Sequence, residues 1–431
     1  MENKVVFHID VNSAFLSWTA AYRVRHLGEA LDLRDVPSVI AGDKSSRHSI
    51  ILAKSIPAKK YGVRTGEPLG MALEKCPGLV IAEPDYELYV NASRSLMALL
   101  REYSPLVEQF SIDEAWMDMT GTAGLFGPPV LAAEQLKDRI RRELGFTVNI
   151  GISCNKLLAK MAGDFEKPDK VHTLFPDEIP QKLWGLPVGE LFMVGRATER
   201  KLRGMGLATI GQLAQTDPVF LRRKLGKQGE MLWQYANGRG MMQVRAQAEA
   251  NKGYGNSFTT PCDVTDRRAA QQVLLSLCET VGMRLRRDFQ AGSCVTVQLR
   301  SCEFVDSSRQ RQLGTATNVT QELYRAACEI FDSLWDGKTL LRQLGVQVTR
   351  LQSGGYRQYS LFDASQYDKL EKLDSTVDSI REKFGEGAII RAAFVDDPQR
   401  SMAGGLSKHR RTGVTKPVPD PGAENRKKSE N

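Results

Sequence analysis

The sequence predicts a multidomain protein of the α+β class. The chain has 431 residues, which is too many for one compact core. Apolar residues make up 42% and charged residues 26%, and this ordinary balance excludes collagen-like, wholly disordered and disulfide-scaffold proteins. Segments that alternate in polarity like strands are mixed with segments of helical periodicity, so we expect about three domains that combine both.

The N-terminal part of the chain predicts a sheet with helices beside it. Residues 4–10 alternate like a strand, with Val5, Phe7 and Ile9 on one face. The other elements predicted here are a helix at 13–27, strands and a turn within 37–66, a hairpin at 107–119, a helix at 131–144 and a strand at 148–152.

The stretch after the last of these strands predicts a helix with a basic face. Ser153 is placed to cap this helix, which has to end before Pro168. Lys156, Lys160 and Lys167 recur at spacings of four and seven residues. We therefore expect them on the face opposite to the apolar side chains.

The C-terminal part predicts a helical region followed by a second α+β region. Residues 172–245 have a helical pattern that glycines interrupt. Beyond them, helices at 267–288 and 319–335 are mixed with β-rich segments.

One more helix is predicted at 364–384, before the end of the chain. Its buried face is expected to be the apolar stripe formed by Leu370, Leu373, Val377, Ile380 and Phe384. From residue 404 onward the chain is basic and poor in apolar residues, so this tail is predicted to be disordered.

Several classes of protein are excluded by what the sequence lacks. No stretch approaches the ~18 consecutive apolar residues of a membrane helix, and the first strand begins so early that no signal peptide is expected. Seven cysteines without a CxxC pair indicate a reduced, cytoplasmic protein. There is no Walker A motif and no GxGxxG, so phosphate binding would rely on metal ions and basic side chains.

An acidic pair stands out in the predicted hairpin. Asp113 and Glu114 lie among apolar residues, where two charges are costly to desolvate without a cation. Asp10 ends the first predicted strand and would join them if the two elements were neighbours in one sheet. Three such carboxylates could hold two divalent ions for phosphoryl transfer. From the residues alone, an acidic turn at the end of a sheet remains the alternative.

Three motifs occur in the order and separation found in Y-family DNA polymerases. They are Asp10-Val-Asn-Ser-Ala-Phe15, Ser111-Ile-Asp-Glu-Ala115 and Gly151-Ile-Ser-Cys-Asn-Lys-Leu-Leu-Ala-Lys160. The third motif, which continues as MAGDFEKPD, is the most specific. The sequence therefore resembles this family of bacterial translesion polymerases from about residue 4 to about residue 400.

The resemblance implies a right-hand polymerase fold. Its parts would be a palm with a mixed sheet, small fingers, a helical thumb with a helix-hairpin-helix, and an α+β little finger. The implied domains are the palm at 1–13 and 68–170, the fingers at 14–67, the thumb at 171–245, a linker at 246–252, the little finger with its C-terminal helix at 253–400, and a basic tail at 401–431.

The resemblance also implies a centre that holds two Mg²⁺ ions. Asp10, Asp113 and Glu114 would hold the ions, with Asp10 and Asp113 shared by both or nearly so, and the carbonyl of Val11 would complete one coordination shell. Glu114 would lie nearer the primer 3′-hydroxyl. All of these are hard oxygen ligands of the kind that Mg²⁺ prefers.

A nucleotide site follows from the same resemblance. Phe15 would be the steric gate, an aromatic ring that collides with a ribose 2′-hydroxyl, and Lys59 and Lys160 would contact the triphosphate. The residues leading to the gate, Asn12, Ser13 and Ala14, would line the site. Two branches of the family stay open: Asn12 resembles the polymerase V catalytic subunit, whereas a Phe gate resembles polymerase IV.

Two regions resemble the DNA-gripping parts of the family. Residues 191–213 are similar to the helix-hairpin-helix of the thumb, whose backbone N–H groups bind phosphate without reading sequence, although Met193 stands where glycine is common. An ordinary helical turn is the alternative there. The expected DNA contacts are Gly195 and Arg196 in the thumb and Arg284, Arg286 and Arg300 in the little finger, where a solvated charged face is the alternative for each arginine.

A peptide after the β-rich segments resembles the sequence that docks on the bacterial sliding clamp, the β subunit. In Gln358-Tyr-Ser-Leu-Phe362 an extended chain would place Gln358, Leu361 and Phe362 in pockets of the clamp. The alternative is an edge strand with a buried Leu-Phe pair.

Together these features predict a template-directed, low-fidelity DNA polymerase that acts in translesion synthesis and DNA repair. Its partners would be primer–template DNA, deoxynucleoside triphosphates and the clamp, and it would be a cytoplasmic monomer. A non-catalytic scaffold that binds DNA and clamp is the alternative, and a two-metal nuclease is a third possibility. Residues 170–352 carry a net charge equal to the +8 of the whole chain. DNA is therefore expected along this part.

Overall fold

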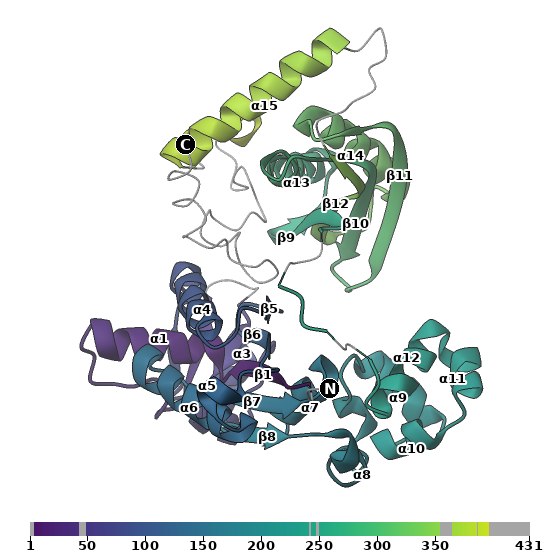
Figure 1. The fold of residues 1–431 in the computed structure, drawn as a ribbon. Helices are drawn as coiled ribbons and strands as arrows, with labels where there is room; N and C mark the ends of the chain where they lie inside the picture. Colours follow the sequence, from purple (N-terminus) through teal and green to yellow (C-terminus); the bar gives the residue numbers. More distant parts are fainter. Residues whose placement is uncertain are drawn as a thin grey trace, which may run out of the picture. The chain divides into compact units, whose positions relative to one another are not determined.

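The computed structural model describes residues 4–42, 49–240, 243–246, 250–353, 364–385 and 387–395. These residues form two compact units, of which the first takes in the described residues up to 246 and the second those from 250 onward (Figure 1). Both units combine helices with strands, so the predicted α+β class is confirmed. The finer boundaries between palm, fingers and thumb inside the first unit stay predictions.

The centre of the first unit is a mixed five-stranded sheet in the order β5-β6-β1-β7-β8. β1 is antiparallel to both of its neighbours, β6 and β7, whereas β8 is parallel to β7. Its strands are β1 (Val6–Val11), β5 (Val107–Gln109), β6 (Glu114–Asp118), β7 (Val148–Ser153) and β8 (Val171–Thr173).

The two faces of this sheet have different coverings. Phe7 and Ile9 belong to a core cluster with α4 (Tyr86–Arg101) and α6 (Pro129–Leu144). α7 (Lys156–Gly163) covers the opposite face. Strand alternation places His8, Asp10 and Glu114 on the α7 face. A short helix, α5 (Ala123–Phe126), precedes α6.

A smaller three-stranded sheet, β3-β2-β4, belongs to the same unit. Because β4 lies beyond residue 67, this sheet extends past the predicted boundary between fingers and palm. Helix α1 joins the two sheets, since Trp18 packs in the palm core and Leu16 in the core of the smaller sheet. The elements are α1 (Ala14–His26), β2 (Ser38–Ala41), β3 (Ile51–Lys54), α2 (Ile56–Lys60), α3 (Leu69–Lys75) and β4 (Val80–Ala82).

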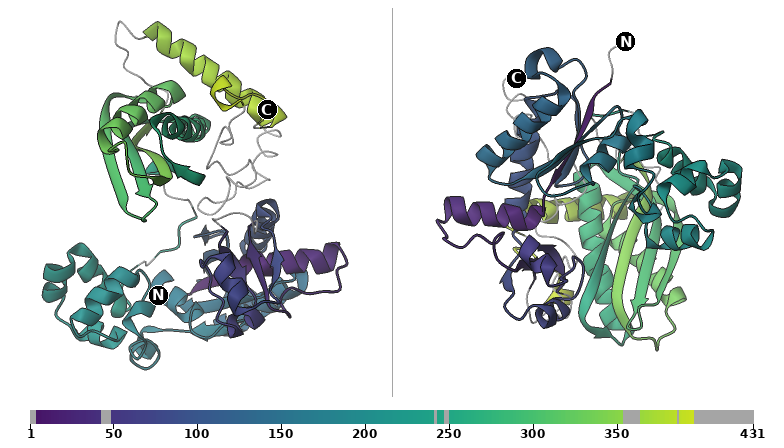
Figure 2. Two further views of the ribbon diagram at one scale, coloured as in Figure 1. Left: turned by 180° about the vertical axis from the view of Figure 1, so that it is seen from behind. Right: turned by 90° about the horizontal axis from the view of Figure 1, so that it is seen from below.

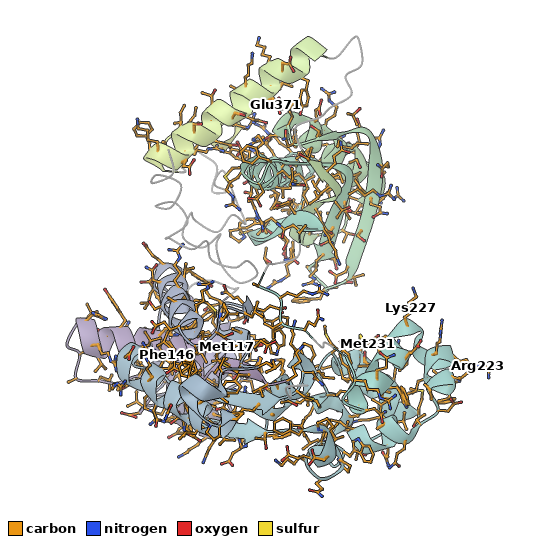
Figure 3. All side chains as sticks on the ribbon, in the orientation of Figure 1. Met117, Phe146, Arg223, Lys227, Met231 and Glu371 are labelled. Atoms are coloured by element: carbon orange, nitrogen blue, oxygen red, sulfur yellow. The ribbon has the colours of Figure 1, made fainter. Side chains whose placement is uncertain are left out.

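The last part of the first unit is helical, as the sequence predicts. Its apolar side chains share one core cluster with Leu157 and Leu158, so the region packs on α7. Figure 3 shows Arg223 and Lys227 pointing outward from this region. The elements are η1 (Pro176–Glu178), α8 (Ile179–Lys182), η2 (Val188–Glu190), α9 (Arg196–Gly204), α10 (Ile210–Gln215), α11 (Pro218–Leu225) and α12 (Lys227–Ala236).

The second unit contains a four-stranded antiparallel sheet in the order β11-β10-β12-β9. Helices α13 and α14 pack on one face of it (Figure 2). Both helices match the predicted ranges closely. The elements are β9 (Gly253–Val264), α13 (Arg267–Arg287), β10 (Gln290–Ser301), β11 (Asp306–Thr317), α14 (Thr320–Leu334) and β12 (Leu341–Ser353).

The final helix, α15 (Ala364–Phe384), confirms the predicted range, and it buries the predicted apolar stripe only in part. Leu373 and Phe384 are 52% and 66% exposed, whereas Asp374 and Arg381 are buried. Leu370, Val377 and Ile380 are half-buried, so the apolar stripe shares the covered side of the helix with buried charged residues. A short turn of helix, η3 (Ala392–Phe394), follows.

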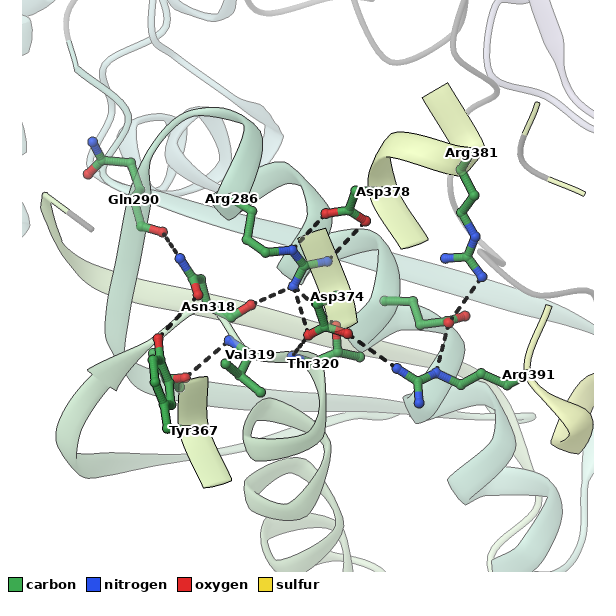
Figure 4. Close-up of polar contacts among 12 residues, drawn as sticks. Arg286, Gln290, Asn318, Val319, Thr320, Tyr367, Asp374, Asp378, Arg381 and Arg391 are labelled. Atoms are coloured by element: carbon green, nitrogen blue, oxygen red, sulfur yellow. Dashed lines mark hydrogen bonds and ion pairs between the residues drawn. The ribbon is translucent and has the colours of Figure 1, made fainter. Parts of the chain in front are cut away.

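Ion pairs hold α15 against α13 (Figure 4). Arg286 of α13 binds Asp374 at 3.1 Å and Asp378 at 2.7 Å. Arg381 and Arg391 bind the buried carboxylate of Glu279 at 3.2 Å and 2.9 Å. Arg391 also lies 3.5 Å from Asp374. We call these six residues the α15 cluster.

Within the described ranges, every helix is too short or too polar to span a bilayer. The clamp-like peptide at 358–362 and the basic tail at 401–431 lie outside the described residues. Both therefore stay predictions.

Candidate active site

Asp10 and Glu114 lie opposite each other on neighbouring strands. In the antiparallel pairing of β1 and β6, Asp10 pairs with Glu114 and His8 with Trp116. The first strand and the hairpin are therefore neighbours in one sheet, as the interpretation of Asp10 required.

Asp113 belongs to the turn before β6 and not to the strand itself. The carbonyl of Asp113 accepts a hydrogen bond from the Val11 amide at 3.1 Å, and its carboxylate accepts one from the Ser111 hydroxyl. Because a turn residue is not bound by strand alternation, Asp113 and Glu114 need not point to opposite faces. The carboxylates of Asp10, Asp113 and Glu114 are close enough to repel one another.

Two lysines and a histidine contact these carboxylates. Lys160 Nζ lies 2.8 Å from Glu114 Oε2, and His8 Nε2 lies 3.4 Å from the same oxygen. Lys167 Nζ pairs with Asp10 Oδ2 and lies 2.8 Å from Asp164 Oδ1. Cations thus reach Asp10 and Glu114 from α7 and the loop that follows it.

The pKa values of the three carboxyl groups differ in direction. Burial raises the pKa of Asp10 in spite of the Lys167 ammonium. Burial, together with repulsion from Asp10 and Glu114, also raises the pKa of Asp113. Burial alone would raise the pKa of Glu114, but His8 and Lys160 outweigh it and lower this pKa to about 2. The negative charge of Asp10 and Asp113 is therefore compensated only in part.

This donor set suits a hard divalent cation. Asp10 and Asp113 offer carboxylate oxygens whose charge a cation would neutralise. In the described part of the chain, no three His, Cys, Asp or Glu side chains form a ready-made metal cluster. A divalent ion bound by Asp10 and Asp113 would need further oxygen ligands from outside these side chains.

Helix α7 differs from its prediction in two ways. All eight of its residues are buried, so Lys156 and Lys160 face the sheet and not solvent. The reason is that the sheet supplies acidic partners, which the helical periodicity of one segment cannot reveal. Asn155, and not Ser153, caps the helix by accepting a hydrogen bond from the Leu158 amide at 2.9 Å.

Lys167 is the site residue to which the sequence interpretation gave no role. Its spacing placed it beside Lys160, but its partner Asp10 is 157 positions away in the chain. Its side chain is 35% exposed, compared with 9% for Lys160. Lys167 lies between the acidic site and solvent. Its position shortly after the GISCNKLLAK motif is the only local sequence signal that could have indicated it.

Phe15 lies in the first turn of α1, close to Asp10 in the chain. Its ring stacks on Tyr89, with centroids 4.5 Å apart and planes 10° apart, and Tyr86 meets it edge-on at 6.3 Å. Ser13 caps α1 with a φ of 49°, and Ala14 is buried. The gate candidate therefore rests on a fixed aromatic support.

Two further residues of the expected nucleotide site differ in their surroundings. Asn12 is engaged within the protein, because its amide donates to Asn149 at 3.2 Å and its oxygen accepts from the Asp169 amide at 3.0 Å. Lys59 is exposed near the end of α2. Burial lowers the pKa of Lys54, and the nearby cations Lys59, Arg64 and Lys75 lower it further, although Glu67 opposes them.

The expected DNA contacts also differ in availability. Gly195 and Arg196 are exposed at the N-terminus of α9, and the backbone of Met193 has a φ of 72°, which explains why glycine is favoured there. Arg300 is exposed and paired with Asp306.

In the second unit, the two arginines of α13 that were expected to contact DNA are engaged within the protein. The guanidinium of Arg284 lies 5.7 Å from the Tyr254 ring. Arg286 is a correction, because the α15 cluster buries its guanidinium and leaves it unavailable to phosphate.

A mixed sheet with carboxylates on one face, a small second sheet and a helical region are the parts of a polymerase palm, fingers and thumb. Three family models match this chain. They are described as the impB/mucB/samB family (residues 9–164), its C-terminal domain (residues 251–361) and the DNA polymerase-iota thumb domain (residues 190–240).

Known DNA polymerases are similar to this chain over most of its length. DNA polymerase IV of Clostridium acetobutylicum is 44% identical over 92% of this chain and all of that protein. DNA polymerase IV 2 of Bacillus subtilis is 37% identical over 91% of this chain and 95% of that protein. The chain belongs to the impB/mucB/samB family of Y-family DNA polymerases, which are DNA-directed DNA polymerases.

A solved structure shares the fold. The Y-family DNA polymerase chimera Dbh-Dpo4(243-245)-Dbh matches with a TM-score of 0.67 and 21% identity, over 80% of this chain and 98% of that one. At this identity the likeness concerns the fold alone. The predicted right-hand architecture is thereby confirmed.

Proposed function

We propose that this polymerase adds deoxynucleotides to a primer 3′-hydroxyl by two-metal phosphoryl transfer and acts in translesion synthesis and repair. The observation that supports this most strongly is the proximity of the Asp10, Asp113 and Glu114 carboxylates at one end of the palm strands, with raised pKa values at Asp10 and Asp113. A non-catalytic scaffold would not need this partly compensated charge.

Each residue of the site has a distinct part in the reaction. Asp10, Asp113 and the Val11 carbonyl would hold Mg²⁺, which when bound lowers the pKa of the 3′-hydroxyl and neutralises charge on the leaving pyrophosphate. Glu114 would lie by the primer 3′-hydroxyl. Lys167, being partly exposed beside Asp10, can turn from the carboxylate to the triphosphate.

The smaller sheet and the thumb would hold the substrates. Lys59, in the positive field around Lys54, would approach the triphosphate. Gly195 and Arg196 at the start of α9, with Arg284 and Arg300, would contact the DNA backbone without reading sequence.

Primer extension on undamaged and lesion-bearing templates tests the function as a whole. We expect Mg²⁺-dependent extension on both templates and misincorporation without proofreading. Release of nucleotides from labelled DNA in place of extension would favour a two-metal nuclease. Binding of DNA without either reaction would favour the scaffold.

Phe15 would exclude ribonucleotides, since its ring is fixed by Tyr89. Phe15→Ala should increase ribonucleotide incorporation while Mg²⁺ dependence is kept. Tyr61→Ala removes an exposed aromatic ring elsewhere in the unit and serves as the control. An unchanged sugar preference in Phe15→Ala would contradict the gate.

The clamp-like peptide has a separate test. Replacing Leu361 and Phe362 by Ala should remove stimulation by the sliding clamp while extension without clamp is unchanged. Retained stimulation would contradict this part of the proposal.

A further inference from the structure

A half-exposed aromatic ring lies beside the acidic site, directly after β5. The Phe110 amide donates a hydrogen bond to the Glu114 carbonyl at 3.0 Å, which continues the pairing of β5 with β6. Cross-strand partners share one face of a sheet, so Phe110 lies on the α7 face with Glu114. Because Asp10 pairs with Glu114 on the other side, Asp10, Glu114 and Phe110 form one row across the palm sheet.

Packing within the protein fixes the Phe110 ring. Its centroid lies 4.9 Å from that of the Trp116 ring, and the Phe192 ring meets it edge-on at 6.2 Å. Trp116 is fully buried, and its indole donates a hydrogen bond to the Lys156 carbonyl at 2.9 Å. Phe110 is nevertheless 45% exposed. One side of a firmly held ring is therefore available to a ligand.

The two sides of Glu114 differ in character. On the β1 side its neighbour is the carboxylate of Asp10. On the β5 side the surface is apolar, because the ring is followed by Phe192 and by Met193, which is 53% exposed. Two residues further along the chain is Gly195, the expected DNA contact of the thumb. The apolar surface thus connects the proposed place of the primer 3′-hydroxyl with the proposed DNA contact at the start of α9.

We propose that Phe110 contacts the terminal nucleotide of the primer strand and supports its deoxyribose through the exposed side of the ring. Neighbouring strands lie about 4.8 Å apart, so a nucleotide whose 3′-hydroxyl lies by Glu114 reaches the next residue of the row. The sugar is uncharged and suits an apolar surface, whereas the triphosphate suits the charged side. This inference rests on the proposed function, because the primer end has to lie by Glu114.

Photo-crosslinking tests the contact directly. The protein with p-benzoylphenylalanine in place of Phe110 should crosslink to a labelled primer at its last nucleotide. The same photoreactive residue in place of Leu106 is the control, since Leu106 is 43% exposed and lies four residues away, about 13 Å along the same strand direction. The control should not crosslink to the primer end. Crosslinks from position 110 to the template strand alone would overturn the inference.

Binding and single-turnover kinetics measure what the contact contributes. Phe110→Ala should weaken primer–template binding by about tenfold, the size expected for one lost aromatic contact to a nucleotide. The maximal rate should fall as well, because the 3′-hydroxyl is less well positioned. The Kd of the incoming nucleotide and the affinity for the unpaired template strand should not change. Phe110→Tyr keeps the ring and should recover most of the loss, and Leu106→Ala should keep all four values.

Unchanged primer–template affinity in Phe110→Ala would overturn the inference and leave Phe110 as a packing residue between β6 and the thumb. Thermal unfolding checks each variant. If Phe110→Ala does not fold, Phe110→Leu preserves the apolar contact with Trp116 and should still lose part of the affinity. The two levels of argument fail separately. Crosslinking to the primer end without extension by the parent chain would defeat the proposed function, whereas extension with crosslinks to the template alone would defeat only this inference.

Discussion

Within the described residues, each unit contains a partly buried charge cluster, and the two clusters differ in charge balance. In the palm cluster four carboxylates face two ammonium groups. Its members are Asp10, Asp113, Glu114, Asp164, Lys160 and Lys167. In the α15 cluster three carboxylates face three guanidinium groups. Its members are Glu279, Asp374, Asp378, Arg286, Arg381 and Arg391.

The difference in charge balance indicates a different role for each cluster. Arginine forks bind carboxylates through several fixed hydrogen bonds, so a balanced arginine cluster fixes how a helix docks. Lysine is a point charge on a flexible stem, and an excess of carboxylates leaves room for an added cation. The α15 cluster therefore serves the fold, whereas the excess of carboxylates in the palm cluster favours the proposed binding of a cation.

The most stringent test of this difference removes one negative charge from the palm cluster. Asp113→Asn should lower nucleotide incorporation by about a thousandfold or more, because a metal ligand is lost. Its thermal unfolding temperature should not fall, since repulsion between buried carboxylates disappears with the charge. Primer extension and thermal unfolding measure the two effects.

Asp118→Asn is the control for this change. Asp118 lies on the same strand but accepts a hydrogen bond from the Thr120 amide, which asparagine can also do. Both activity and stability should stay near those of the parent. A large stability loss in Asp113→Asn would show that Asp113 serves the fold.

The same kind of change in the α15 cluster should have the opposite outcome. Asp374→Ala leaves Arg286 and Arg391 without a shared carboxylate in a buried place. Breaking such a buried pair costs about 3–5 kcal/mol. Denaturant unfolding and hydrogen exchange in α15 of the full chain measure the loss. Glu382→Ala, on the exposed side of α15, is the control, and equal stability of both variants would contradict a structural role for the cluster.

The two clusters differ in how well the sequence predicts them. The strands, the hairpin and most helices were predictable because period and motif are local properties. The three palm carboxylates were predictable because their spacing matches a family. The α15 cluster was not, since the apolar stripe containing Leu373 predicts an apolar buried face and gives no sign of buried charges. The buried Asp374 and Arg381 find their partners about a hundred residues away in the chain, beyond what periodicity can report.

A smaller effect is expected when a palm lysine is removed. Lys167→Met should weaken nucleotide binding by about tenfold, the size expected for one lost charge-assisted hydrogen bond. The maximal rate should change less than the Kd. Lys170→Met, an exposed lysine paired loosely with Glu166 at 3.9 Å, is the control. A lower maximal rate with an unchanged Kd in Lys167→Met would contradict a role for Lys167 in nucleotide binding.

The smallest effect belongs to an ion pair outside both clusters. Arg300 and Asp306 are exposed at the surface, so the pair adds little to stability. If Arg300 meets a DNA phosphate, Arg300→Ala should weaken duplex binding and reduce the slope of log affinity against log salt by about 0.9. Arg325→Ala is the control, because Arg325 is on α14, on the helix-covered side of the sheet. An unchanged salt slope in Arg300→Ala would mean that this surface arginine is only solvated.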